Sequence, residues 1–281
     1  MTDNPPHGQV LATLAATLPS LTPAEQAVAR QLLNSPAESV ELNSQELAER
    51  AGTSRATAVR VAQRLGFAGY TQLRVAIAKE HDPAQVAVDP RHRGVGDSFA
   101  QTAAAADSMA ALLNPEDAEK AVGVLAAADR LLVIGNGLSA GLALDTAARF
   151  NSIGRHAEHV FDPISQQVCA GQLGDEDAVL ICSGSGAHHD SVRVAEIAHQ
   201  AQAQVIALTS CRPSPIASRS DICLVVGMPG AGFADELSST SRVPQAILCE
   251  ALVQAVAEER GSQSGRAKRT SLGLVAEHLE D

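Results

Sequence analysis

Aromatic side chains are nearly absent from this sequence of 281 residues, which has no Trp, one Tyr and five Phe. The core must therefore be built from Ala, Val, Leu and Ile, a composition that suits helices packed on a parallel sheet. The sequence also lacks an uninterrupted run of about eighteen apolar residues, and its N-terminus lacks the basic segment of a signal peptide. These absences predict a cytoplasmic protein that does not enter a membrane.

Paired cysteines are missing as well, because the five Cys residues follow no C-x-x-C spacing. Cys182, Cys223 and Cys249 lie inside apolar runs, where a cysteine is usually a small buried hydrophobe. The adjacent His188 and His189 would point apart on a helix, and no Cys or carboxylate completes a ligand set with them. The sequence thus predicts reduced thiols, no metal site and no cofactor.

Acidic residues are absent from one segment of an otherwise acidic protein. The formal net charge is −11, yet no Asp or Glu lies between Arg50 and Lys79, a segment with six basic residues. An acidic protein with one such segment has a place for phosphates and little tendency to bind polyanions elsewhere. On charge alone, a solvated helix face remains an alternative to a nucleic-acid contact.

The same segment has the pattern of a helix-turn-helix. We expect a first helix over residues 45–51 and a second over residues 55–65, with Gly52 in the turn because glycine adopts positive φ freely. Ala48 is small where the two helices would cross, and Ser54 is a good N-cap for the second helix. An ordinary helical hairpin is the alternative, but these features together with the acid-free arginine face favour DNA.

Projection of the second helix predicts which side chains face the DNA. Arginine can form a bidentate pair with guanine, and threonine can meet a thymine methyl group or a phosphate. Ser54 and Arg64 are expected to contact phosphates more than bases. The predicted DNA-binding residues are Ser54, Arg55, Thr57, Arg60 and Arg64.

The chain divides into segments of different pattern. Residues 1–80 read as short helices, of which one begins with a capping box of Thr22, Pro23 and Glu25 and another covers residues 70–79. Residues 81–97 hold prolines, glycines and scattered charge, as in a linker. Residues 98–260 form the second predicted domain, which opens with two Ala-rich helices over residues 98–113 and 115–128. Residues 261–281 are expected to be a polar tail that ends in a weak helix.

From Arg130 onward, short apolar runs alternate with helical stretches. The expected strands are residues 131–134, 157–161, 178–182, 205–209 and 222–226. The expected helices between and after them are residues 139–152, 163–173, 191–201 and 244–259. Such alternation predicts an α/β domain with a five-stranded parallel sheet, doubly wound with right-handed crossovers.

Two loops rich in glycine and serine follow strands of this predicted sheet. The first holds Gly135, Gly137 and Ser139, and such a turn before a helix presents backbone N–H groups to an anion. The second follows residues 178–182, and its hydroxyls can donate to phosphate oxygens while its glycines let the backbone approach. Both loops would lie at the carboxyl edge of the sheet, where open α/β sheets bind ligands. The predicted ligand-binding residues are Gly137, Ser139, Ser183, Gly184, Ser185, Gly186, His188 and Thr209.

A dinucleotide site is an alternative use of the first loop. Ala140 stands at a position where the dinucleotide fingerprint allows alanine, and Asp162 could imitate its ribose-binding acid. A dinucleotide fold does not require the Ser183–Gly186 loop, which therefore favours a small dianion. Either loop alone could be structural.

Taken in order, these motifs resemble the RpiR-type transcription regulators over nearly the whole chain. The N-terminal resemblance lies in residues 21–25, 46–48, 51–54, 57–60 and 65–70. The C-terminal resemblance is to the sugar isomerase (SIS) domain and lies in residues 135–139, 153–154, 162, 183–186, 207–210, 214–215, 217, 221 and 241–242.

This resemblance implies a winged or extended helix-turn-helix and an SIS sheet, in homodimers or homotetramers that bind palindromic operator DNA. It implies a phosphorylated sugar effector held by Ser139, Ser183 and Ser185, and a role in regulating carbohydrate metabolism. The family usually has a Thr shortly after the second serine motif, where this chain has His188.

Two other functions stay open at this point. A phosphosugar aldose–ketose isomerase shares the SIS domain and needs a general base near C1–C2 of the sugar, for which Glu236, Glu250 or His188 could serve. No acid–base pair is sharply placed, and the fused DNA-reading domain favours a sensor over an enzyme. A dinucleotide-responsive regulator would use Asp162 on the ribose.

Overall fold

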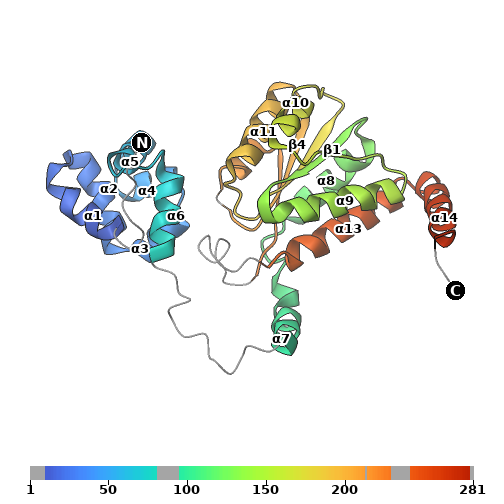
Figure 1. Ribbon diagram of the computed structural model, residues 1–281, viewed down its shortest axis with the longest axis horizontal. Helices are drawn as coiled ribbons and strands as arrows, with labels where there is room; N and C mark the ends of the chain where they lie inside the picture. Colours follow the sequence, from blue (N-terminus) through green and yellow to red (C-terminus); the bar gives the residue numbers. More distant parts are fainter. Residues whose placement is uncertain (1–9, 81–94, 213, 229–240, 279–281) are drawn as a thin grey trace. The chain divides into compact units, whose positions relative to one another are not determined.

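The computed structural model describes residues 10–80, 95–212, 214–228 and 241–278, which form two compact units that divide after Ala100. The first, here called the helical unit, is all-α over residues 10–80. The second, the α/β unit, contains one parallel sheet with helices on both faces (Figure 1). This two-part architecture confirms the predicted fold class. No helix of the described residues has the length and apolar character needed to cross a bilayer.

The helical unit is made of short helices, and capping residues in the local sequence mark where several of them begin. Thr22 and Glu25 form the expected capping box at the start of α2, and Asn43 and Glu46 form a second one at α4. The elements are α1 (Val10–Thr17), η1 (Leu18–Ser20), α2 (Pro23–Asn34), α3 (Pro36–Glu41), α4 (Ser44–Arg50), α5 (Arg55–Arg64) and α6 (Tyr70–Glu80). Residues 10–80 contain no strand, so the domain is an extended helix-turn-helix and not a winged one over these residues.

The short helix α3 was not expected from the sequence. Its last carbonyls accept hydrogen bonds from side chains of α6, at sequence separations of 31 to 34 residues. Tyr70 Oη donates to Ser39 O at 2.7 Å, and the buried Arg74 guanidinium donates to Val40 O and to Glu41 O. Tertiary contacts therefore satisfy a helix end that the local sequence leaves open.

The α/β unit is built on five parallel strands in the order β2-β1-β3-β4-β5. This is the doubly wound order in which the chain reverses its direction of winding between β1 and β3. The strands are β1 (Leu131–Gly135), β2 (Glu158–His159), β3 (Ala178–Cys182), β4 (Gln204–Thr209) and β5 (Ile222–Val225). The five predicted strands are confirmed, although β2 is shorter than the expected residues 157–161.

Helices cover both faces of the sheet, and alternate strand residues contact opposite layers. Leu131 and Val133 pack with one set of helices, whereas Leu132 and Ile134 pack with the other. The first layer contains α8 (Pro115–Ala127), α9 (Ala140–Ser152) and α13 (Val243–Glu259), and the second contains α10 (Pro163–Ala170) and α11 (His189–Gln200). Each strand is buried on both faces, which explains its nearly continuous apolar sequence.

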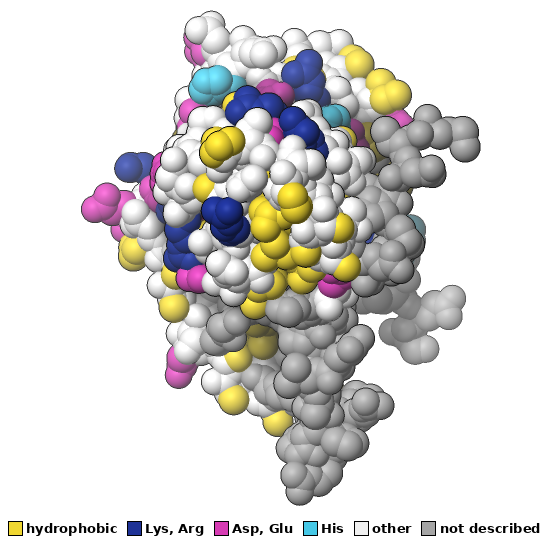
Figure 2. Space-filling model, turned by 90° about the vertical axis from the view of Figure 1, so that its left-hand side faces the viewer, with side chains coloured by type: hydrophobic (Ala, Val, Ile, Leu, Met, Phe, Trp, Pro, Cys, Tyr) yellow, Lys and Arg dark blue, Asp and Glu magenta, His cyan; other side chains and the backbone are white. Residues whose placement is uncertain are grey.

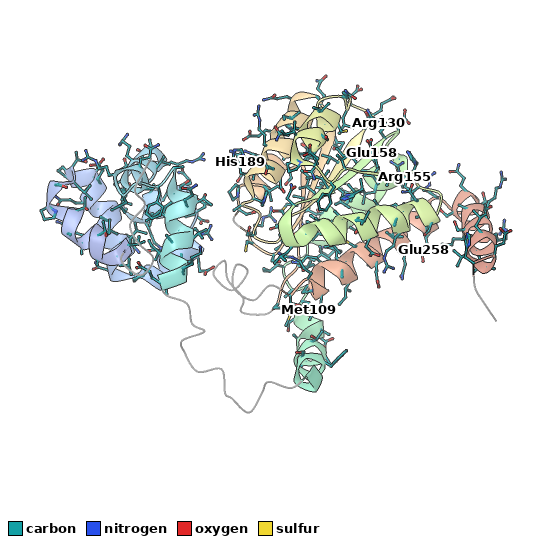
Figure 3. The ribbon with its side chains drawn as sticks, viewed as in Figure 1. Met109, Arg130, Arg155, Glu158, His189 and Glu258 are labelled. Atoms are coloured by element: carbon teal, nitrogen blue, oxygen red, sulfur yellow. The ribbon has the colours of Figure 1, made fainter. Side chains whose placement is uncertain are left out.

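A buried arginine fastens the first layer to the sheet. Arg155 is 3 % exposed and donates to Leu125 O at 2.7 Å and to Ala128 O at 2.6 Å, where α8 ends. Arg130 and Glu158, beside it in Figure 3, form an ion pair of 3.4 Å between the starts of β1 and β2. The hydrogen bonds of Arg155 hold the end of α8 beside the segment that leads into β2.

Two terminal regions differ from the prediction. Residues 95–97, expected to end a linker, form the first turn of α7 (Val95–Ala105), and the rest of that predicted linker, 81–94, lies outside the described residues. The tail, expected to be polar at first and to end in a weak helix, is helical over most of its length, as α14 (Ser262–Ala276). Its Ser and Gly residues are poor indicators of a helix, but packing of Ala267 on Gly154 holds it in place.

Candidate functional site

The two glycine–serine loops begin side by side at the carboxyl edge of the sheet. Gly135, at the end of β1, pairs with Cys182, at the end of β3, and Cys182 pairs with Leu208 of β4. The first residues after these strands, Asn136 and Ser183, are therefore neighbours. This edge includes the point between β1 and β3 where open α/β sheets form a ligand crevice.

The first loop requires glycine at two positions for different reasons. Gly137 has φ +57°, in the left-handed region that side chains rarely adopt. Gly135 has no such angle, but a Cβ there would lie 2.5 Å from the carbonyl oxygen of Ser139. The backbone therefore folds tightly over the end of β1, and Ser139 is carried to the start of α9, where it is 4 % exposed.

The second loop packs against the end of β4 and against Ser214, which lies further along the chain. Gly186 has φ +63°, and a Cβ there would lie 2.4 Å from Ser214 Oγ and 2.9 Å from Thr209 Oγ1. Thr209 is fully buried, donates its hydroxyl to Gly184 O at 2.9 Å, and accepts from Cys211 N at 3.2 Å. The hydroxyl proton of Thr209 is thus used in a hydrogen bond to the loop. We assign Thr209 the role of positioning this loop, not of contacting a ligand.

Two serine hydroxyls in this arrangement have no hydrogen-bond partner among the described residues. Ser139 and Ser183 are 4 % and 5 % exposed, and neither hydroxyl makes a hydrogen bond with another described residue. The half-buried Ser185 accepts a hydrogen bond from Ala187 N at 3.3 Å and keeps its own proton. Neither the Ser139 nor the Ser183 oxygen is among the fully buried side-chain atoms without a partner in the described residues. Hydroxyl donors at such an edge can bind a ligand or water.

An amide-centred network holds the first loop against two helices. Asn136 Nδ2 donates to Gln166 Oε1 on α10 and to Ser191 Oγ on α11, each at 3.0 Å. Gln166 Nε2 in turn donates to Val160 O at 2.8 Å, beyond β2. Asn136, Gln166 and Ser191 were not predicted as site residues, because they are brought together by crossovers that no local pattern specifies.

A second residue missed from sequence approaches the same edge from α13. Gln245 is 1 % exposed, and its Nε2 donates to Ser210 Oγ just after β4. Its Oε1 is buried without a hydrogen-bond partner among the described residues. Glutamine in the first turn of an apolar helix carries no recognisable signal in one sequence, although its burial here is unusual for an amide.

The remaining residues considered from sequence have separate positions. His188 is the N-cap residue of α11, without a side-chain capping bond, and its ring lies 3.9 Å from Asp190 Oδ2. Asp162 caps α10 by accepting from Ser165 N at 2.7 Å, and this hydrogen bond lowers the pKa of Asp162. Glu250 is exposed on α13 and pairs with Arg149 at 3.2 Å. Glu236 lies outside the described residues.

In the helical unit, α4 and α5 form the expected helix-turn-helix. Gly52 has φ +64° in the turn, and Ser54 caps α5 by accepting from Thr57 N at 3.3 Å. Leu47, Ala48 and residues of α5 are buried where the helices meet. Figure 2 shows dark blue Lys and Arg side chains on the face of the helical unit that is turned to the viewer.

The structure corrects the expected orientation of Thr57. This residue is 3 % exposed, and its hydroxyl contacts Ser54 Oγ at 2.9 Å and accepts from Arg60 Nη2 at 3.0 Å. The side chain therefore faces the helix-turn-helix core and orients Arg60. The helical projection of α5 predicted an outward Thr57 and was wrong, because the neighbouring helices bury a wider face of α5 than the projection assumes.

The basic residues between Arg50 and Lys79 differ in their exposure and in their ion pairs. Arg74 is buried and binds α3, and Arg50 forms an ion pair with Glu38. Arg64 is about half exposed and pairs with the buried Glu25 at 3.2 Å. The exposed Arg55 donates to Ser44 Oγ at 3.2 Å. With Ser54 and Arg60 also exposed, the basic surface of α5 is centred on Arg55, Arg60 and Arg64.

Glu25 links the first capping box to this surface. Its pKa is lowered chiefly by the hydrogen bond from the Thr22 backbone, and the hydroxyl of Thr22 and the charge of Arg64 lower it further against the effect of burial. The carboxylate thus stays ionised and holds Arg64 at the C-terminal end of α5.

Comparison with known proteins agrees with this two-part organisation. The helix-turn-helix domain of the rpiR family matches residues 8–84, and the SIS domain matches residues 124–255. An HTH-type transcriptional regulator of Caldanaerobacter subterraneus subsp. tengcongensis is 30% identical over 258 residues, which cover 89% of this chain and 91% of the relative. The chain belongs to the RpiR family of HTH-type transcriptional regulators.

Other relatives of this RpiR-family regulator extend the comparison. The HTH-type transcriptional regulator HexR of Pseudomonas aeruginosa is 27% identical over 259 residues, 90% of either chain. The structure of Vibrio vulnificus NanR complexed with ManNAc-6P has a TM-score of 0.80 at 23% identity and covers 97% of this chain and 100% of NanR. The sugar isomerase domain of an RpiR transcription factor from Sphaerobacter thermophilus has a TM-score of 0.54 at 22% identity, over 61% of this chain and 94% of that one.

Proposed function

We propose that this regulator binds a phosphosugar at the carboxyl edge of its SIS sheet and that the ligand changes its affinity for operator DNA. The observation that carries the proposal is the position of Ser139 and Ser183 on adjacent loops at the sheet edge, where neither hydroxyl makes a hydrogen bond with another described residue. A phosphate group has acceptor oxygens for both and for Ser185, and the helix start after each loop favours an anion. NanR, which shares the fold, is complexed with ManNAc-6P.

His188 and Gln245 are candidates for contacts to the sugar. His188 stands at the N-cap of α11, directly after the second loop, and Gln245 has a buried acceptor oxygen beside Ser210. The effector's chemical identity depends on such contacts, because a phosphate alone is common to all phosphosugars. Gly137, Gly184 and Gly186 would let the backbone approach the phosphate, and Thr209 would support them from below.

The experiment for the ligand is a thermal shift assay with a panel of hexose, pentose and amino-sugar phosphates. A ligand at a hundred times its Kd stabilises the folded protein by about 2.7 kcal/mol, which corresponds to a rise in Tm of roughly 5–10 °C for a domain of this size. Ser183→Ala/Ser185→Ala should abolish the shift. Ser152→Ala, an exposed serine whose hydroxyl only caps Arg149 O, is the matched control and should keep it. A panel without any stabilising phosphosugar would refute the proposal.

For the DNA contact we propose Ser54, Arg55, Arg60 and Arg64 as the surface residues, with Thr57 in a supporting role. Arg60→Ala should weaken operator binding by about 1–3 kcal/mol if the guanidinium reads a base, measured by fluorescence anisotropy at fixed salt. A two-fold symmetric oligomer on a palindromic operator remains part of this proposal. An affinity equal to that of wild type would remove Arg60 from the reading surface.

We infer that the protein is a sensor and not an isomerase. Glu250 on α13 is engaged with Arg149, and the carboxylate beside His188, that of Asp190 at 3.9 Å, lies in the first turn of the same helix, α11. The capping role of Asp162 likewise disfavours the dinucleotide alternative. Assays of aldose–ketose interconversion with each stabilising phosphosugar should show no turnover, and NAD and NADH should leave the Tm unchanged.

A further inference from the structure

A groove with an apolar floor lies between α8 and α13, on the outer side of the α/β unit. Its volume is about 740 Å³, and its small side chains allow a close approach of another backbone. The floor and walls are formed by Leu113, Ala118, Val122, Gly123, Leu248, Ala251, Leu252 and Ala255. Such a lining suits an apolar helix face better than a polar small molecule.

The exposed side of α13 points to the same conclusion. Ile247, Ala251 and Ala255 follow one another at a spacing of four and lie on one side of the helix. Ile247 is 52 % exposed although the opposite side of α13 is fully buried. A helix that is apolar on nearly all sides is normally covered on all sides. Among the described residues of this chain, nothing covers this side.

Three carboxylates line the rim of the groove. Glu119 comes from α8, and Glu258 and Glu259 come from the C-terminal end of α13, where Figure 3 labels Glu258. None of the three makes an ion pair or hydrogen bond with another described residue. The rim is therefore negative and uncompensated, which favours a partner segment that is both apolar and basic.

The helix α14 has that chemistry. Its last turns expose Leu272, Leu274 and Val275, at 71 %, 58 % and 54 %. Its middle carries three basic residues that form no ion pair with any described residue, namely Arg266, Lys268 and Arg269. An apolar end beside a cluster of positive charge complements the apolar floor and acidic rim of the groove.

The α14 helix and the groove of the same chain are kept apart by the anchoring of α14. Ala267 packs directly on Gly154, and Ser271 Oγ donates to Ser152 O at 3.1 Å, both beyond the end of α9. Only Arg260 and Gly261 join α13 to α14, and Arg260 is itself bound to Ala126 O at 2.8 Å. A helix fixed in this way presents its apolar end outward, to a second molecule.

We propose that α14 of one copy of the chain docks in the α8–α13 groove of a second copy. Leu272 and Val275, which lie one turn apart on the same side of α14, contact the apolar floor, and the basic residues of α14 face the acidic rim. Two-fold symmetry makes the contact reciprocal, so each copy offers one helix and one groove.

The test measures crosslinking between two preparations of the full chain, each with one added cysteine and both carrying Cys169→Ser, so that the four remaining native thiols are buried. One carries Ala251→Cys in the groove, and the other carries Leu272→Cys on α14. After subunit exchange, a short bismaleimide should join them at least tenfold faster than it joins Leu272→Cys to Gln200→Cys, an exposed position on α11. A rate equal to this control would overturn the proposal.

Charge reversal gives the matched second arm. Glu119→Lys, Glu258→Lys and Glu259→Lys on the groove partner should cut the crosslinking rate about tenfold, the effect of losing about 1.4 kcal/mol of attraction. Adding Arg266→Glu, Lys268→Glu and Arg269→Glu to the α14 partner should restore it, because the charges are again complementary. Failure of this restoration, or an intramolecular crosslink in a chain carrying both cysteines, would overturn docking between copies.

Discussion

Gly52 in the helical unit and Gly186 in the α/β unit have almost the same backbone angle, φ +64° and +63°, in very different surroundings. A Cβ at Gly52 would meet nothing within 4 Å, whereas one at Gly186 would lie 2.4 Å from Ser214 Oγ. The turn of the helix-turn-helix is formed by its own few residues and is open to solvent. The loop of the SIS domain is closed by residues far along the chain. The reading surface is thus a local structure and the ligand site a non-local one.

The largest predicted effect compares these two glycines directly. Gly186→Ala should destabilise the α/β unit by about 3 kcal/mol, because strain in the left-handed region of about 1–2 kcal/mol adds to overpacking of about 1–3 kcal/mol. Gly52→Ala should cost the helical unit only the strain, about 1–2 kcal/mol. Urea unfolding followed by circular dichroism measures both. Equal losses at the two positions would show that close packing does not distinguish the turns.

A second prediction concerns polar contacts between distant segments of the helical unit. Arg74→Ala leaves Val40 O and Glu41 O without their donor and should destabilise this unit by about 2 kcal/mol, as expected for buried hydrogen bonds to a charged group. Arg55→Ala, in which an exposed arginine is lost, should change stability by less than about 0.5 kcal/mol. Urea midpoints give both values. A stable Arg74→Ala protein would mean that α3 keeps its position without α6.

The smallest predicted effect is the acid sensitivity of Glu25. Its pKa is lower in the folded state than in the unfolded chain, so its ionised form adds stability above the ordinary carboxyl pKa. That contribution is lost as the pH falls through the lowered value. Glu25→Gln should therefore flatten the acid side of the stability profile of the helical unit, measured by unfolding between pH 7 and pH 3.

Glu196 provides the internal comparison for this pH profile. Hydrogen bonds and charge from Arg219 and Arg193 lower the pKa of this carboxyl on α11, so the α/β unit has its own acid-sensitive increment. Glu25→Gln should leave that increment unchanged. If Glu25→Gln changed the pH dependence of stability equally in both units, its effect would come from the change in net charge and not from the contacts of Glu25.

Most of the secondary structure could be predicted because its signals are local. Capping boxes, an N-terminal proline and the glycine turn identify helix starts, and continuous apolar runs identify strands buried on both faces. The failures occurred where tertiary contacts override weak local preferences. The α3 end is satisfied by Tyr70 and Arg74, and α14 is held by Ala267 on Gly154. Neither of these two contacts between distant segments could be predicted from one sequence.

The candidate ligand site likewise contains residues that were predicted from sequence and residues that only the structure identified. The loops with Ser139, Ser183 and Ser185 were found because their residue types follow apolar strands, and parallel strands end at one edge. Asn136, Gln166 and Gln245 were missed because a buried amide has no pattern of its own. The role of Thr209 also required the structure, since an outward hydroxyl and a supporting one look the same in sequence.

The acid-free segment and the two glycine–serine loops already predicted, by themselves, a basic helix-turn-helix and two adjacent loops at one edge of an α/β sheet. Charge and local turn chemistry suffice for those predictions because both act over a few residues. Only the tertiary structure decided that Thr57 faces inward, that Arg74 is a buried anchor, and that the hydroxyls of Ser139 and Ser183 bond to no other described residue. Burial and hydrogen-bond satisfaction depend on which distant segments meet, and that meeting is a property of the packed chain.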